Sequence, residues 1–169
     1  TIARTNLWSF LYGDVNVSVQ LGNESIAYDW GQVDATHLLA ARSEVDFNNL
    51  TCANSTHQHQ ENTVMGLLEQ PVSLEHTFTS PEHATLRISN SILPMNTCNT
   101  TYTTVNGTMQ SSVYKEMVLY DQSATQVVYL TDIYNESHGF DAEAHDYQMI
   151  VPENGTDGTP TTYYMYVII

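Results

Sequence analysis

Apolar residues in this chain of 169 residues fall in short runs separated by turn-forming residues, and the clearest runs alternate with polar residues. In residues 15–21, valine and leucine alternate with asparagine, serine and glutamine, which is the period of a half-buried strand. A turn at residues 21–25 leads into a second apolar run at residues 26–30. The two segments together predict a β-hairpin.

Further strand candidates follow at irregular spacing. They are residues 72–78, 86–92, 102–109, 113–120, 126–133, 147–151 and 163–169. Segments 35–42 and 63–69 are predicted to form one or two helical turns, too few for a helical layer. About eight or nine short strands joined by turn-rich loops predict an all-β single domain, a β-sandwich or jelly roll of antiparallel strands. The turn-rich loop 153–160 is expected to join the last two strands as a hairpin.

Eight N-x-[ST] triplets lie in this chain, whereas random placement of its asparagines, serines and threonines would give about 2.6. The triplets begin at Asn16, Asn23, Asn49, Asn54, Asn99, Asn106, Asn135 and Asn154. An attached oligosaccharide is bulky and hydrated, so each used site must face solvent in a protein that has crossed a membrane. The excess predicts a secreted, N-glycosylated protein. The alternative is a threonine-rich β-protein with accidental triplets.

Nineteen acidic residues face only four lysines and arginines, which gives a net charge of −15. Phosphate binding needs clustered Lys and Arg, so this charge argues against nucleic acid and anionic lipid as partners. No apolar run approaches the roughly 18 residues that a membrane helix requires. The numbering opens at Thr1 rather than Met, which suggests a removed leader, although a trimmed sequence would look the same. We therefore expect an extracellular or cell-surface chain with no integral membrane segment.

The two cysteines, Cys52 and Cys98, are predicted to form a disulfide, because an even number in a secreted chain is the usual sign of one. Such a bond closes a long loop and contributes about 4 kcal/mol in the chain-entropy model. Two buried free thiols are the alternative. A metal site is disfavoured because neither cysteine has a CxxC partner.

Few residues are arranged for chemistry. On a strand, His57 and His59 would share one face and, with Glu61, suit a divalent metal, but their polar surroundings favour solvated histidines in a loop. The acidic segment 141–146 would allow a structural calcium ion, although it lacks EF-hand spacing. No nucleophile elbow, P-loop, dinucleotide fingerprint or zinc-protease motif occurs. We expect no catalytic, cofactor-binding or metal-ligating residues, and a protein that is not an enzyme.

The two ends of the sequence are unusually apolar. Residues 1–12 contain Ile2, Leu7, Trp8, Phe10 and Leu11. Residues 163–169 are apolar or aromatic on both alternating faces, and such a strand needs protein on both sides. A central strand of the monomer satisfies this need. A terminal strand that completes the sheet of a neighbouring copy satisfies it as well.

Residues 8–15 read WSFLYGDV and are followed by YDW at residues 28–30. These phrases resemble a family of archaeal secreted surface proteins, which has an aromatic–Gly–Asn–Val–Ser–Gly phrase and then Tyr-Asp-Trp. The segments HGFD at 138–141, DYQMIVPENG at 146–155 and TYYMYV at 162–167 match its closing phrases. The cysteines fall where the family carries its pair. The chain departs from the family at residues 17–19, where glycine usually follows serine, and at residues 168–169, where an acidic residue is usual.

The resemblance implies an archaeal envelope location and a β-rich domain, but no activity. By looser analogy, archaeal bundling pilins and threads are secreted β-sandwich subunits that polymerise by donating a terminal strand. We therefore expect a structural subunit of an archaeal extracellular filament or pilus, a head-to-tail homopolymer. Residues 1–12 are the candidate donor strand and residues 13–169 the β-sandwich domain. The alternative is a monomeric surface-layer-associated or adhesive binding glycoprotein.

Overall fold

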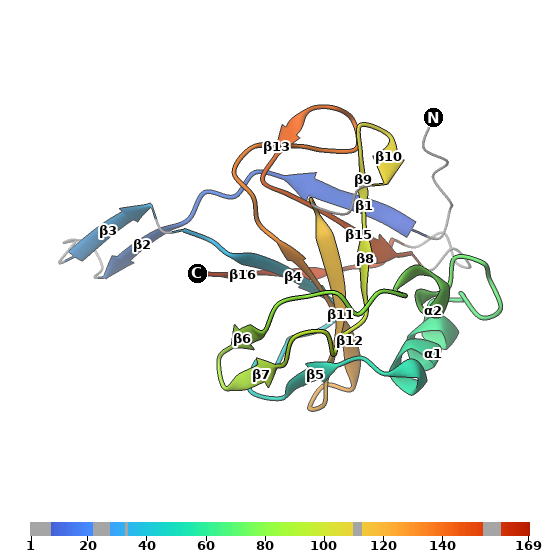
Figure 1. The fold of residues 1–169 in the computed structure, drawn as a ribbon. Helices are drawn as coiled ribbons and strands as arrows, with labels where there is room; N and C mark the ends of the chain where they lie inside the picture. The colour runs from blue at the N-terminus through green and yellow to red at the C-terminus, as the bar shows by residue number, and fades with distance from the viewer. Residues whose placement is uncertain (1–7, 22–27, 33, 110–112, 154–159) are drawn as a thin grey trace.

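A computed structural model describes residues 8–21, 28–32, 34–109, 113–153 and 160–169 of the chain. With 42% strand and 10% helix arranged in several antiparallel sheets and no barrel, the molecule is a β-sandwich-like single domain. This confirms the all-β prediction. The fold is built around one large sheet, with smaller elements packed on both of its faces (Figure 1).

The large sheet has six antiparallel strands. Its order is β16 (Tyr164–Ile168), β4 (His37–Ala41), β12 (Gln126–Asp132), β11 (Lys115–Asp121) and β5 (Leu50–Cys52), with β8 (Thr100–Tyr102) also pairing with β11. The long central hairpin β11–β12 pairs Glu116 with Thr131 at one end and Asp121 with Gln126 at the other. The strands predicted at residues 113–120, 126–133 and 163–169 all lie in this sheet.

The central strands bury apolar side chains on both faces of the sheet. On β12, Val127 and Tyr129 join one core cluster, whereas Val128 and Leu130 join the other. Strand β4 does the same with Leu38 on the first face and Leu39 on the second. Because both faces are apolar, the sheet needs a cover on each side.

The first face is covered by two groups of elements. Strands β1 (Trp8–Gly13) and β15 (Tyr147–Pro152) form an antiparallel pair whose Met149 and Val151 enter the core. Helices α1 (Ser55–Val64) and α2 (Leu74–Thr77) lie beside this pair. Leu74, the first residue of α2, and Phe78, its C-cap, join the same cluster. The predicted strand at 147–151 is therefore confirmed as β15.

The second face is covered by the hairpin of β6 (Leu86–Ile88) and β7 (Ser91–Leu93), which places Leu86, Ile88 and Leu93 in the second cluster. Three smaller antiparallel pairs complete the fold. They are β2 (Ser18–Leu21) with β3 (Tyr28–Gln32), β9 (Thr104–Val105) with β10 (Thr108–Met109), and β13 (Ser137–His138) with β14 (Ala144–His145). The β2–β3 pair confirms the hairpin predicted near the start of the sequence, and it extends away from the rest of the molecule (Figure 1).

Two secondary-structure predictions were wrong for related reasons. Residues 37–41, expected to be helical, form β4, because a strand buried on both faces shows no polar alternation and cannot be told from a helical turn by its pattern. Residues 72–78, expected to be a strand, contain α2 instead. There the side-chain Oδ1 of Asn62 accepts a hydrogen bond from Leu74 N, a contact between helices that no local pattern reveals.

Two loop predictions were also wrong. The His57–His59 region begins α1 rather than a loop, because the side chain of Asn54 accepts a hydrogen bond from the His57 backbone and caps the helix. The last two strands do not form a hairpin. Strand β15 pairs with β1, whereas β16 pairs with β4 in the large sheet, so the two strands belong to different sheets; residues 154–159 of the expected turn lie outside the described residues.

An ion pair anchors α1 to the first face of the sheet. Arg42, at the end of β4, donates from Nε and Nη2 to the two carboxylate oxygens of Glu61, whose side chain is buried. The hydroxyl of Tyr129 on β12 donates to the same carboxylate at 3.3 Å. Three hydrogen bonds thus converge on one buried carboxylate, and they fix α1 in one position on the sheet.

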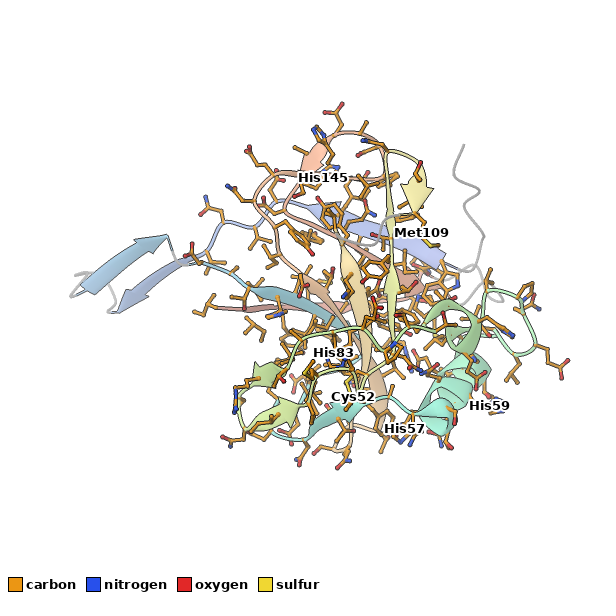
Figure 2. All side chains as sticks on the ribbon, in the orientation of Figure 1. Cys52, His57, His59, His83, Met109 and His145 are labelled. Atoms are coloured by element: carbon orange, nitrogen blue, oxygen red, sulfur yellow. A yellow bond between two sulfur atoms is a disulfide. The ribbon has the colours of Figure 1, made fainter. Side chains whose placement is uncertain are left out.

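Cys52 and Cys98 form the predicted disulfide, which links β5 to the loop before β8. The buried histidine His83, labelled in Figure 2, supports this loop. Its Nε2 accepts hydrogen bonds from the backbone amides of Thr97 and Cys98, while Nδ1 donates to the carbonyl of Ala84 at 2.7 Å. The sequence pattern gave no reason to single out this residue.

Replacing both Cys52 and Cys98 with alanine should lower the free energy of unfolding by about 4 kcal/mol, because the loop that they close spans 46 residues. Urea unfolding of the variant and the wild type, followed by circular dichroism, measures the difference. A difference below about 1 kcal/mol would contradict a stabilising role for the crosslink.

A second prediction concerns Glu116, whose side chain is fully buried on β11. Its Oε2 accepts a hydrogen bond from Ile150 N at 2.8 Å, and its Oε1 has no partner among the described residues. Burial raises the pKa of the Glu116 carboxyl well above its usual value, so the folded state holds a proton that the unfolded state releases above about pH 4.3. The stability from this carboxyl is full below that pH and falls as pH rises through the folded-state pKa.

Glu116→Gln should remove this dependence. Just above pH 5, the wild type should lose up to about 1.4 kcal/mol more per pH unit than the variant. Urea unfolding at pH 5, 5.5 and 6 measures the two slopes, and Glu44→Gln, at an exposed carboxylate, is the matched control. Parallel profiles for wild type and Glu116→Gln would contradict the protonated state.

Candidate assembly interface

Strand β16 forms one edge of the large sheet. It pairs with β4 from Tyr164 opposite Ala41 to Ile168 opposite His37. Among the described strands it has no other partner, so its second edge is open. Thr36 extends the pairing beyond the strand, since its backbone N–H donates to the Ile168 carbonyl at 2.8 Å.

The side chains around β16 divide into a packed set and an exposed set. Tyr166 and Ile168 pack against the second core cluster, and the Tyr166 ring meets Phe47 edge-on at 5.3 Å. The exposed set consists of Tyr164 at 50%, Met165 at 41%, Val167 at 37% and Ile169 at 59% relative exposure. Edge strands are usually protected from association by lysine, proline or a bulge, and β16 carries no charge and no proline. We call β16 with this exposed set the open edge.

A hollow of about 340 Å³ adjoins the open edge. It lies between β1, β15 and β16 and is lined mainly by apolar and aromatic side chains: Phe10, Leu11, Tyr12, Tyr147, Tyr163 and Met165. Burial raises the pKa of the Tyr163 hydroxyl far above its usual value, and this hydroxyl donates to the carbonyl of Pro152 at 2.6 Å. The neutral phenol therefore ties the start of β16 to the end of β15 and holds one wall of the hollow in place.

The predicted donor segment is partly integrated into its own chain. Strand β1 lies antiparallel on β15, from Trp8 opposite Pro152 to Gly13 opposite Tyr147. The indole Nε1 of Trp8 donates to the Val72 carbonyl at 2.8 Å, and Leu11 packs against the first core cluster. Phe10 stacks on Phe140 with the ring centroids 4.8 Å apart.

The boundary expected between residues 12 and 13 therefore falls within one strand. Ile2 and Leu7, the other two residues predicted to mediate polymerisation, lie outside the described residues. A donor role for residues 8–12 would require β1 to leave β15. A donor role for residues 1–7 would not.

Six of the eight sequon asparagines are described. Five of them are exposed, namely Asn16, Asn49, Asn54, Asn106 and Asn135, and Asn99 is half-buried. Asn23 and Asn154 lie outside the described residues. None of the six described asparagines lies within β1, β15 or β16. Carbohydrate attached to them would therefore not be attached to the strands that form the open edge and its surroundings.

The two candidate metal-binding histidines do not converge (Figure 2). On helix α1, residues two apart point about 200° around the axis from each other, and the buried Gln58 lies between them. His57 completes the helix cap, since its Nδ1 accepts from Asn54 N at 3.4 Å, and its ring stacks on Tyr120 with centroids 3.6 Å apart. Burial lowers the pKa of the His57 imidazole. The Glu61 carboxylate instead accepts hydrogen bonds from Arg42 and Tyr129.

Two carboxylates of the acidic segment 141–146 make contacts within the folded chain. The Asp141 carboxylate contacts His145 Nε2 at 3.0 Å, and the two carboxylate oxygens of Asp146 accept from Val15 N and Glu136 N. In the part of the chain that the structure describes, no group of three or more histidine, cysteine or acidic side chains is placed to hold a metal ion. These side chains have structural partners.

Comparison with family models, with curated proteins and with solved structures finds no match to this chain. No helix in the described part of the chain is both long enough and apolar enough to cross a lipid bilayer. The function is therefore inferred from the chain's own surface. Sequence reasoning favoured residues 1–12 over 163–169 as the assembly element. The signal that distinguishes β16 was present in the uninterrupted apolar run of residues 163–169, but only the sheet order reveals its open edge.

Trp8→Ala should lower the free energy of unfolding of the monomer by about 2–4 kcal/mol, because Trp8 packs against Phe78 and its indole nitrogen holds the 72–74 turn. Urea unfolding of dilute protein measures this loss. Met109→Ala, at a side chain that is 70% exposed, is the control and should change stability by less than about 0.5 kcal/mol. If Trp8→Ala leaves the free energy of unfolding of the monomer unchanged, β1 does not pack on its own chain in solution.

Proposed function

We propose that this chain is a secreted, glycan-coated structural subunit of an archaeal extracellular filament, in which copies join by strand addition at the open edge. The observation that carries the proposal is the contrast between this edge and the rest of the molecule. The chain has a net charge of −15, yet β16 is uncharged, apolar and unpaired on one side among the described strands. A surface of this kind favours association with another polypeptide strand.

The proposed donor is the segment 1–7 of a neighbouring copy, which precedes β1. Seven residues are the length of a typical strand, and β16 offers five for pairing. The segment contains Ile2 and Leu7 for apolar contacts. It also carries Arg4, one of only four basic residues in the chain, which is favourable when the partner is strongly acidic. The donor's own β1 would anchor it, since β1 stays packed on β15.

The free energy of such a joint has three sources. Each backbone hydrogen bond made along the open edge contributes about 0.5–1.5 kcal/mol net. Covering the exposed parts of Tyr164, Met165 and Val167 contributes roughly 1 kcal/mol per side chain, since each is about half exposed. An apolar donor side chain that fills the adjoining hollow contributes about 1.5–3 kcal/mol more. These gains must exceed the cost of association, which is at least about 4 kcal/mol.

The geometry of the contact decides what kind of assembly results. Donor and acceptor are different surfaces of the chain, so the contact is heterologous and leaves a free donor and a free acceptor at the ends of every oligomer. Such a contact propagates into a filament unless the rotation closes a ring. Glycans on the exposed sequons would limit lateral association of the filaments, because a hydrated carbohydrate layer keeps protein surfaces apart.

Met165→Lys combined with Val167→Lys should abolish assembly, because both exposed side chains lie on the open edge and a buried unpaired charge is strongly unfavourable. Electron microscopy and sedimentation velocity should find monomers. The matched control, Ile92→Lys with Met95→Lys, adds the same charge at side chains that are 54% and 60% exposed on and after β7, and should still form filaments.

Donor and acceptor can then be separated by mixing. A chain lacking residues 1–7 keeps β1 and should be monomeric, yet its acceptor edge remains. Mixed in equal amounts with the Met165→Lys/Val167→Lys chain, it should form dimers only, because each dimer uses the one intact donor and the one intact acceptor. Filaments formed by either variant alone would refute the proposed joint.

The second candidate function is a monomeric surface-layer-associated or adhesive binding glycoprotein. The hollow beside the open edge favours it, since Tyr12, Tyr147 and Tyr163 supply the aromatic lining common in small-molecule binding sites. Size-exclusion chromatography and negative-stain microscopy of native cell-surface material distinguish the two candidates. A stable monomer at high concentration would favour the binding protein.

A further inference from the structure

The sequons at Asn49 and Asn54 lie five residues apart, and their side-chain amides make different hydrogen bonds. Both asparagines are exposed, so exposure alone gives no reason to distinguish them as modification sites. What differs is the amide nitrogen Nδ2, the atom to which an N-linked sugar is attached.

The side-chain amide nitrogen of Asn49 donates both of its hydrogens to groups of the folded chain. Its Nδ2 donates one hydrogen bond to Asp46 Oδ2 at 2.7 Å and another to Ser123 Oγ at 2.9 Å. Ser123 Oγ in turn donates to the same carboxylate oxygen at 2.8 Å, which closes a triangle of polar contacts between two loops. The hydrogen bonds from Ser123, Asn49 and Asn48 lower the pKa of the Asp46 carboxyl, so the acceptor stays charged at neutral pH.

The chemistry of N-glycosylation conflicts with this triangle. The amide nitrogen attacks the anomeric carbon of a sugar carried on a lipid phosphate. A nitrogen–carbon bond forms, the carbon–oxygen bond to the phosphate breaks, the lipid phosphate leaves with the electron pair, and one amide proton passes to a base of the transferase. The product keeps a single N–H. On Asn49, the sugar would have to occupy the space taken by Asp46 or Ser123, and one of the two hydrogen bonds would be lost.

The rest of the Asn49 sequon is held in the large sheet. Leu50 is only 4% exposed, and Thr51 pairs with Tyr120 of β11. The Thr51 hydroxyl is directed to the Tyr120 carbonyl at 3.5 Å. A transferase must reach the asparagine and the hydroxyl residue of the sequon together, and in the folded chain the second of these is part of a paired strand.

Asn54 presents the opposite arrangement. Its side-chain oxygen Oδ1 accepts from His57 N at 2.9 Å and caps α1, which leaves the amide nitrogen on the other side of the group. Among the described residues, no acceptor lies within hydrogen-bond distance of that nitrogen. Ser55 and Thr56 are exposed in the first turn of the helix. A sugar on Nδ2 is compatible with the helix cap, because the cap uses only the oxygen.

We infer that the folded chain is glycosylated at Asn54 and that Asn49 stays unmodified as a structural residue that joins the loop before β5 to the β11–β12 turn. This inference rests on the carbohydrate coat of the proposed function. It adds that the fold, rather than the triplet alone, selects which sequon of this pair is used.

The test is mass spectrometry of the protein purified from its native cell surface, with fragmentation that separates the two asparagines. The expected result is a glycan on Asn54 and none on Asn49. Asn54→Gln should lower the intact mass by one glycan. Asn49→Gln should leave the glycan mass unchanged and lower the melting temperature by about 2–4 °C, the effect of losing about 1 kcal/mol of hydrogen bonding.

Ser123→Ala is the matched control, because it opens the triangle without removing the sequon. It should lower the melting temperature like Asn49→Gln. A glycan on Asn49 of the wild-type protein, or an unmodified Asn54 beside glycosylated sequons elsewhere, would overturn the inference. A chain with no glycan at any sequon would instead remove the carbohydrate coat from the proposed function. Assembly is tested separately by the lysine variants of β16, so the two failures are distinguishable.

Discussion

Burial of both faces of one sheet is the constraint on which the rest of this structure depends. Strands β4, β11 and β12 carry apolar side chains above and below the sheet plane, so neither face can be left to solvent. The β1–β15 pair and helices α1 and α2 cover one face, and the β6–β7 hairpin covers the other. Covering the two faces leaves the edges of the sheet unaffected, because the backbone groups at the outer side of the last strand still need a partner strand. That is why β16 can be well packed and still have one edge that none of the described strands pairs with.

The covering elements are held by a small number of buried polar contacts. The Arg42–Glu61 pair with Tyr129 fixes α1, and His83 fixes the loop that carries Cys98. Each contact joins segments far apart in the sequence, and each replaces hydrogen bonds to water that burial removes. They contribute specificity more than net stability, since a buried ion pair gains little over apolar packing but costs much when one partner is lost. These contacts therefore give each small covering layer one defined position, which apolar packing alone would not specify.

Charge separates the surface into two kinds. Most of the molecule carries its excess of carboxylates, which keeps copies apart at low salt, whereas β16 is uncharged and the adjoining hollow is lined mainly by apolar and aromatic side chains, with Glu153 as its carboxylate. The proposed contact between copies uses this one edge. A protein designed only for solubility would carry a lysine or proline there. The absence of such protection on β16 makes this edge the best candidate for a contact with another polypeptide.

The sequence by itself determined the fold class, the disulfide, the strands with clear boundaries and the acidic, sequon-rich surface. Each of these follows from local pattern, residue count or net charge: residues 113–120 and 126–133 read as strands because valine, leucine and tyrosine are concentrated between turns. Only the tertiary structure decided that residues 37–41 are a strand, that 74–77 are a helix and that β15 and β16 lie in different layers. It also decided that Asn49 is a structural residue and that β16 lies at an edge. The physical reason is that burial on two faces removes the periodicity from which strands are read, and that strand order and loop contacts depend on partners far away in the chain.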